Sequence, residues 1–206
     1  MSFYERRILP LLVNCVCGSP VIEHQRRLVV PQATGRVLEI GFGSGLNLEH
    51  YDRTRVEWIW ALEPSASMRT LAAPRVARSG LDVRPLDMRG EDLPLPDKSV
   101  DSVVMTYTLC TIPDATAAMK QVRRVLRPGG KLHFCEHGAA PDAGVRRWQD
   151  RLDPLWTRLA GGCHLNRPMA SLITSSGLRL DDVQMAYLPG TPRFAGYNTW
   201  GAASPG

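Results

Sequence analysis

The chain has 206 residues, of which 44% are apolar and 22% are charged, which is ordinary for a globular protein and long enough for one well-buried domain. Its net charge of +5 permits an anionic partner. However, the arginines stand in scattered pairs without interleaved aromatic residues, which argues against nucleic-acid binding. We expect no signal peptide, no segment near the roughly 20 apolar residues of a spanning helix, and no obligate protein partner. Five cysteines without the spacing of a disulfide framework favour a cytoplasmic location.

The first 31 residues predict helices that cover the rest of the chain. Apolar residues recur at helical spacing over residues 2–17, and a second helix is expected from residue 20 to residue 30. The first pattern fits a helix packed on the domain, a lid over a functional site, or a segment in peripheral contact with a membrane. We favour the packed helix or lid, residues 1–31.

Strands alternate with helices between residues 36 and 136. Strands are expected over 37–40, 56–62, 81–86, 102–106 and 131–136, with helices over 66–78 and 114–126. This alternation predicts a parallel sheet covered on both faces, within one domain of residues 1–206. Beyond residue 137 we expect helices over 143–159 and 168–176, followed by two closing strands over 178–187 and 194–202, all on the substrate side.

A glycine-rich turn organises the chain. Gly41, Gly43 and Gly45 follow the first strand, and residues 46–51 are expected to begin a helix, the arrangement in which α/β folds bind nucleotide-like ligands. Leu46 stands where dinucleotide-binding folds pack a third small residue, which disfavours NAD and FAD. Glu63 ends the second strand about 20 residues later, where an acid can accept hydrogen bonds from ribose hydroxyls.

These features, with EDLPLPD at 91–97, SVD at 99–101 and VLRPGG at 125–130, resemble class I S-adenosylmethionine-dependent methyltransferases. The resemblance implies a Rossmann-like three-layer sandwich with a seven-stranded, mostly parallel sheet, an antiparallel last strand, and extra N-terminal helices. It also implies S-adenosyl-L-methionine as cofactor, with the glycines at its methionine part, Glu63 at its ribose and residues 88–91 around its adenine. Arg89 stands where relatives often have an adenine-binding Asp, so Asp87 or a backbone group must serve. The cofactor-binding residues implied are Glu39, Gly41, Phe42, Gly43, Gly45, Asn47, Glu63, Pro64, Met68, Arg89, Gly90, Glu91, Thr106, Tyr107 and Cys110.

The C-terminal third resembles a narrower group. The pieces EH at 136–137, WQ at 148–149, LDPLW at 152–156, GCHLNR at 162–167 and GY at 196–197 are similar to the methyltransferase-like family whose mammalian members methylate alkyl thiols at membranes. This resemblance implies a small, apolar acceptor, with a thiol favoured. The residues expected at the acceptor are Tyr4, Trp148, Trp156, Arg167 and Tyr197.

Transfer to a thiol needs an in-line approach more than acid–base help, because a thiolate is already a nucleophile. A neighbouring histidine would increase the thiolate fraction, which makes His137, Asp153 and His164 the catalytic candidates. The cysteines and histidines lack zinc-ligand spacing, so we expect no metal. Two alternatives remain open: an N- or C-methyltransferase of a lipid amine or quinone precursor, and a non-catalytic cofactor-binding protein of the same fold.

Overall fold

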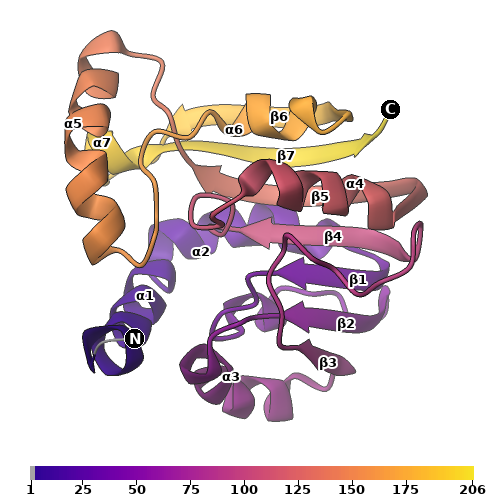
Figure 1. Ribbon diagram of the computed structural model, residues 1–206. Helices are drawn as coiled ribbons and strands as arrows, with labels where there is room; N and C mark the ends of the chain where they lie inside the picture. The colour runs from indigo at the N-terminus through magenta and orange to yellow at the C-terminus, as the bar shows by residue number, and fades with distance from the viewer. Residues whose placement is uncertain (1–2) are drawn as a thin grey trace.

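The computed structural model describes residues 3–206, in which a seven-stranded sheet lies between two layers of helices (Figure 1). The strand order is β3-β2-β1-β4-β5-β7-β6, and β7 runs antiparallel to both of its neighbours. The predicted fold class is therefore confirmed, including the antiparallel last strand. The strands are β1 Gly35–Ile40, β2 Val56–Leu62, β3 Val83–Leu86, β4 Val100–Thr106, β5 Leu126–His137, β6 Leu178–Tyr187 and β7 Tyr197–Pro205.

The helices occupy both faces of this sheet. Side chains alternate along a strand, so Leu38 joins the core beneath α4 and α6, whereas Val37 joins the core beneath α2 and α3. No helix within residues 3–206 has the length and apolar character needed to cross a bilayer. The helical elements are η1 Tyr4–Ile8, α1 Leu9–Cys17, α2 Pro20–Val29, η2 Val30–Gln32, η3 Leu46–Glu49, α3 Ala66–Ser79, α4 Ala115–Val125, α5 Ala143–Leu159, α6 Met169–Ser175 and α7 Arg193–Gly196.

Three predicted elements differ from the structure. The strand expected over 131–136 begins five residues earlier, at Leu126. The helix expected over 46–51 is only the short 3-10 segment η3, because the buried side chains of Asn47 and Tyr51 both hydrogen-bond Glu39 and tether this segment to β1. The strand expected over 194–202 begins only at Tyr197. Phe194 lies instead in α7, where its carbonyl oxygen accepts a hydrogen bond from Gln149.

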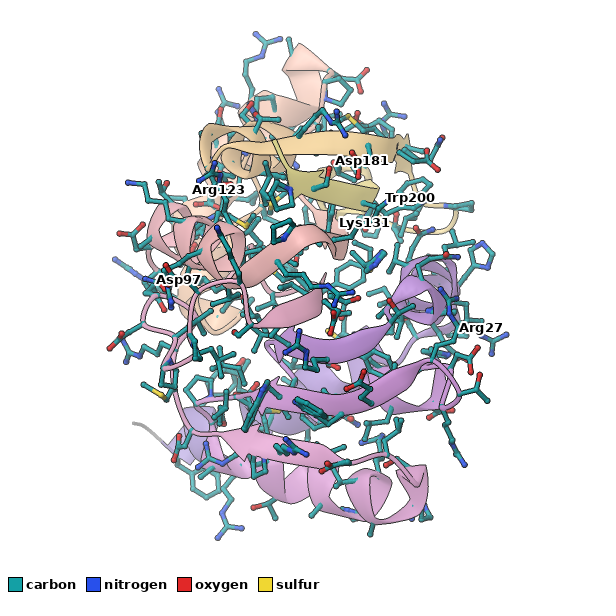
Figure 2. All side chains as sticks on the ribbon, turned by 90° about the vertical axis from the view of Figure 1, so that its right-hand side faces the viewer. Arg27, Asp97, Arg123, Lys131, Asp181 and Trp200 are labelled. Atoms are coloured by element: carbon teal, nitrogen blue, oxygen red, sulfur yellow. The ribbon has the colours of Figure 1, made fainter. Side chains whose placement is uncertain are left out.

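The two ends of the parallel strands differ in their surroundings. The arrows of β1, β2 and β4 point toward the edge where α1 and α5 stand (Figure 1). At the opposite edge, charged groups are paired: Lys131 Nζ lies 3.7 Å from an oxygen of Asp181 (Figure 2), and Asp101 pairs with Arg36 and Arg127. Open ligand-binding groups are therefore expected where the parallel strands end.

Candidate active site

A cavity of about 380 Å³ lies where the parallel strands end, within the roughly 300–1,000 Å³ typical of small-molecule sites. Its walls come from the turn after β1, the end of β2, the loops after β3 and β4, and helix α1. Most of the predicted cofactor residues meet here. Those on the wall are Gly41, Phe42, Gly43, Glu63, Pro64, Met68, Arg89, Gly90, Glu91, Thr106 and Tyr107.

The glycine turn and Glu63 form one hydrogen-bonded unit. Glu63 Oε2 accepts from the Gly43 backbone N–H at 2.9 Å, and Oε1 accepts from the Ser65 N–H at 2.8 Å. Burial raises the pKa of Glu63, while these two donors oppose the shift. Gly41 has φ +73°, and a Cβ there would lie 2.1 Å from Thr108 Oγ1, so no larger residue fits without movement. The turn thus holds its backbone and a carboxylate against the cavity.

Four predicted cofactor residues lie behind this wall. Glu39 is fully buried and accepts from Asn47 Nδ2 at 3.0 Å and from the Tyr51 hydroxyl at 2.6 Å. Burial raises the pKa of Glu39 to about 7. Gly45 adopts a left-handed conformation that begins η3, and Cys110 is buried farther away. In this structure Glu39, Gly45 and Asn47 support the turn from behind.

Arg26 on α2 is a cavity residue that the sequence analysis missed. Its Nη1 donates to Asn47 Oδ1 at 2.7 Å and to Thr106 Oγ1 at 2.5 Å, and the residue is 5% exposed. Its guanidinium lies 5.7 Å from the ring centre of Tyr107, and its buried Nε has no hydrogen-bond partner within residues 3–206. A buried guanidinium with a spare donor suits a carboxylate ligand. Nothing in the run of arginines at 26–27 distinguishes this one from its exposed neighbour.

Helix α1 closes one side of the cavity with Val13, Asn14 and Cys17. Asn14 Oδ1 accepts from Ser44 Oγ in the glycine turn at 2.7 Å. Near its other end, the Tyr4 hydroxyl donates to the carbonyl of Leu159 at 2.7 Å. The N-terminal segment therefore connects the glycine turn with the end of α5.

The residues predicted for the acceptor do not line the cavity. Trp148 is 59% exposed, whereas the Trp156 ring packs edge-on against Phe194. Arg167 donates to the carbonyl oxygens of Leu109 and Ile112, both at 2.6 Å, and so fixes the loop that follows β4. Tyr4 and Tyr197 likewise make contacts outside the wall, Tyr197 with the ring of Tyr187. Any direct contact of these residues with an acceptor stays a prediction.

None of the three catalytic candidates lies on the cavity wall. His164 Nδ1 is 2.9 Å from Asp153 Oδ2, which forms a pair between α5 and the following loop. His137 Nε2 is 3.1 Å from Cys163 Sγ. Burial would lower the pKa of His137, but the contact with Cys163 and nearby acids raises it overall. Their catalytic roles also stay predictions.

The residues expected around the adenine differ in whether they reach the cavity. Arg89, Gly90 and Glu91 reach the cavity, but Asp87 does not. Both carboxylate oxygens of Asp87 are paired with Arg69, at 2.7 and 2.9 Å. Asp87 would have to give up this ion pair to reach a ligand, so Glu91 or a backbone group is the better placed partner.

The sheet order, the open glycine turn and the strand-end acid define a class I S-adenosylmethionine-dependent methyltransferase fold. S-adenosylmethionine fits the site on three observations: Arg26 offers a spare buried donor for its carboxylate, the turn leaves room that a side chain would fill, and Glu63 faces the cavity where ribose hydroxyls can donate.

Comparisons with known proteins agree with this class. Residues 38–134 match the family described as methyltransferase domain, and the chain carries such a domain. Thiol S-methyltransferase TMT1B from Homo sapiens is 37% identical over 66% of this chain and 57% of its own length. The protein of the same name from Rattus norvegicus is 31% identical over 74% and 63%. The chain therefore matches less than two thirds of either relative. A solved geranyl diphosphate methyltransferase in complex with SAM has a TM-score of 0.70 at 14% identity, covering 92% of both chains.

Proposed function

We propose that this chain transfers a methyl group from S-adenosylmethionine to the thiol of a small apolar molecule. The assignment of a thiol acceptor rests on the similarity to thiol S-methyltransferases over 66–74% of the chain. This similarity extends beyond the matched methyltransferase domain. Uncharged residues on the cavity wall support an apolar acceptor. Outside the glycine turn they include Val13, Cys17, Ile112, Pro113 and Gly161.

The bound cofactor supplies an electrophilic methyl group on a sulfonium sulfur. Around it, Arg26 binds the carboxylate, the glycine turn presents backbone groups to the methionine part, and Glu63 accepts hydrogen bonds from the ribose. These contacts come from rigid elements, because Glu63 and Arg26 are each held by hydrogen bonds inside the protein. Fixing the electrophile in this way converts binding energy into orientation.

The acceptor needs little chemical help from the chain. A thiol with a pKa near 8.5 is ionised to roughly 3% at pH 7, and the thiolate attacks without a general base. This agrees with a cavity wall on which none of the catalytic candidates lies. Helix α1 acts as a lid that covers the acceptor and keeps water from the reacting atoms. The contact of Asn14 on α1 with Ser44, and that of Tyr4 in the preceding η1 with Leu159, support that role.

An acceptor panel tests the proposal. The protein is incubated with methyl-labelled cofactor and, separately, an alkyl thiol, an alkyl amine, a phenol and a quinone precursor, and the products are identified by mass spectrometry. We expect S-methylated product only, and loss of most turnover in Arg26→Met. Transfer only to nitrogen or carbon would refute the proposal that the acceptor is a thiol. Cofactor binding without transfer to any acceptor would refute the proposal that the chain is an enzyme.

A further inference from the structure

Three side chains with soft or borderline donor atoms meet beside the cavity. Cys110 follows β4, His137 ends β5, and Cys163 follows α5, so the fold brings together positions separated by 26 or more residues. Their donor atoms all lie within 4.8 Å of one another. From sequence we expect no metal, because these spacings match no zinc-binding pattern.

The separations fit a tetrahedral ion. A Zn²⁺ with Zn–S distances of about 2.3 Å places two thiolate sulfurs about 3.8 Å apart. Cys110 Sγ and Cys163 Sγ are 3.8 Å apart. A nitrogen and a sulfur ligand would be separated by about 3.6 Å, and His137 Nε2 is 3.1 Å from Cys163 Sγ, so a small displacement of the ring suffices. A disulfide would instead need the sulfurs at about 2.05 Å.

Side-chain hydrogen bonds hold the two loops that carry the cysteines, and His137 is held as the last residue of β5. Glu136 Oε1 accepts from the Thr108 and Leu109 N–H groups at 2.7 and 2.9 Å, and fixes the loop that carries Cys110. Asp153 Oδ1 accepts from the Leu165 N–H at 2.7 Å, and fixes the loop that carries Cys163. Such support keeps ligands oriented before an ion arrives.

One polar atom in the cluster is unsatisfied. His137 Nδ1 is buried without a hydrogen-bond partner in the described part of the chain, which is rare for a buried polar side-chain atom. Because Nε2 is the nitrogen that faces Cys163, Nδ1 needs a water molecule as its partner when Nε2 ligates an ion. An isolated pair of thiols and an imidazole gains little from burial, whereas two thiolates and a neutral imidazole balance the charge of one divalent ion.

We propose that Cys110, His137 and Cys163 bind one Zn²⁺ ion, with a fourth coordination position left for water or a small ligand. Three protein ligands with one open position is the arrangement of reactive rather than purely structural zinc sites. None of the three ligands lies on the wall of the cofactor cavity, although Tyr107 of that wall stacks on the His137 ring with centroids 6.5 Å apart. This assignment does not depend on the identity of the methyl acceptor.

A cobalt titration tests the site directly. Reduced full-length protein, stripped of metal, is titrated with Co²⁺, which reports thiolate ligands by an intense near-ultraviolet charge-transfer band. We expect one equivalent to bind, Zn²⁺ to displace it, and the band to disappear in Cys163→Ser and to weaken in His137→Gln. Cys15→Ser is the matched control, because Cys15 is exposed on α1 outside the cluster, and it should behave as wild type.

The wild-type titration is decisive even if a variant fails to fold. Binding of less than about 0.2 equivalent of Co²⁺ at micromolar free metal, or a band unchanged in a folded Cys163→Ser variant, would overturn the proposal. A Cys110–Cys163 disulfide in the purified protein, with no stoichiometric metal binding after reduction, would overturn it as well.

Discussion

Two regions of the molecule meet at the cavity and are built differently. The proposed cofactor region, residues 36–106, uses backbone groups and an acid that lie near one another in sequence. The proposed acceptor region, which comprises α1, residues 107–113 and residues 137–206, uses side chains from distant segments, as in the link from Tyr4 to Leu159. The cofactor region can serve methyltransferases with different acceptors. The acceptor region can vary while the cofactor region stays the same, so we expect it to determine which acceptor is methylated.

The largest expected effect concerns the buried acid of the cofactor region. Burial raises the folded-state pKa of Glu39 to about 7, above its unfolded value, so the folded state binds the extra proton and stability is lost as pH rises through 7. Relative to wild type, Glu39→Gln should therefore gain roughly 2–3 kcal/mol of unfolding free energy between pH 5 and pH 8. Urea unfolding at both pH values measures this difference.

Glu57→Gln is the control for this experiment, because Glu57 is exposed on β2. Between pH 5 and pH 8, the unfolding free energy of Glu57→Gln should not change relative to that of wild type. Equal pH profiles for Glu39→Gln and wild type would mean that the cofactor region does not hold a strained, desolvated carboxylate.

Gly41→Ala breaks the cofactor region at its turn. The new Cβ would meet Thr108 Oγ1 at 2.1 Å, so the turn must shift and affinity for S-adenosylhomocysteine should fall about 100-fold or more. Gly129→Ala is the matched control, since Gly129 has φ +79° with nothing within 4 Å of a Cβ. Equal losses of S-adenosylhomocysteine affinity in the two variants would show that backbone strain alone, rather than a displaced glycine turn, explains the effect.

Arg26→Met tests whether Arg26, on α2, contributes to cofactor binding. It removes a buried cation bonded to Asn47 and Thr106, and cofactor affinity should fall roughly 10- to 100-fold, the value of hydrogen bonds to a charged group. Arg27→Met is the control, because Arg27 points outward (Figure 2) and pairs with Glu23. Similar affinity in both variants, measured by calorimetry, would remove Arg26 from the site.

The smallest expected effect lies in the acceptor region. Tyr4→Phe removes the bond to the Leu159 carbonyl and should raise KM for the acceptor about two- to threefold, with cofactor affinity unchanged. Tyr187→Phe also removes an exposed tyrosine hydroxyl bond, to Asp142, and should leave both constants unchanged. A loss of cofactor affinity in Tyr4→Phe would erase the functional division between the regions.

The same division explains how far sequence reasoning reaches. The strands and the glycine turn were predicted because their signals are local: an apolar run, then Gly41, Gly43 and Gly45, then an acid one strand later. Arg26 was missed because its partner Thr106 lies 80 residues away, and only the packing of α2 brings them together. The Cys110, His137 and Cys163 cluster arises in the same way, from two loops and the end of β5, which no spacing rule connects.

Individual elements repeat this lesson. The helix expected over 46–51 had suitable residues, but burial of two polar side chains against Glu39 decided the local structure. Trp148 and Trp156 have the same residue type and lie on the same helix, yet one is exposed and the other packs on Phe194. Motif likeness does not determine which way each side chain faces.

The central claim is that the cavity at the strand ends is an S-adenosylmethionine site held by Glu63. Calorimetric titration of S-adenosylhomocysteine into wild type, Glu63→Ala and Asp87→Ala tests it most directly. We predict one site per chain, at least about tenfold weaker binding in Glu63→Ala from lost hydrogen bonds to a charged group, and unchanged binding in Asp87→Ala. Absence of binding to wild type, or an unchanged dissociation constant in Glu63→Ala, would contradict the claim.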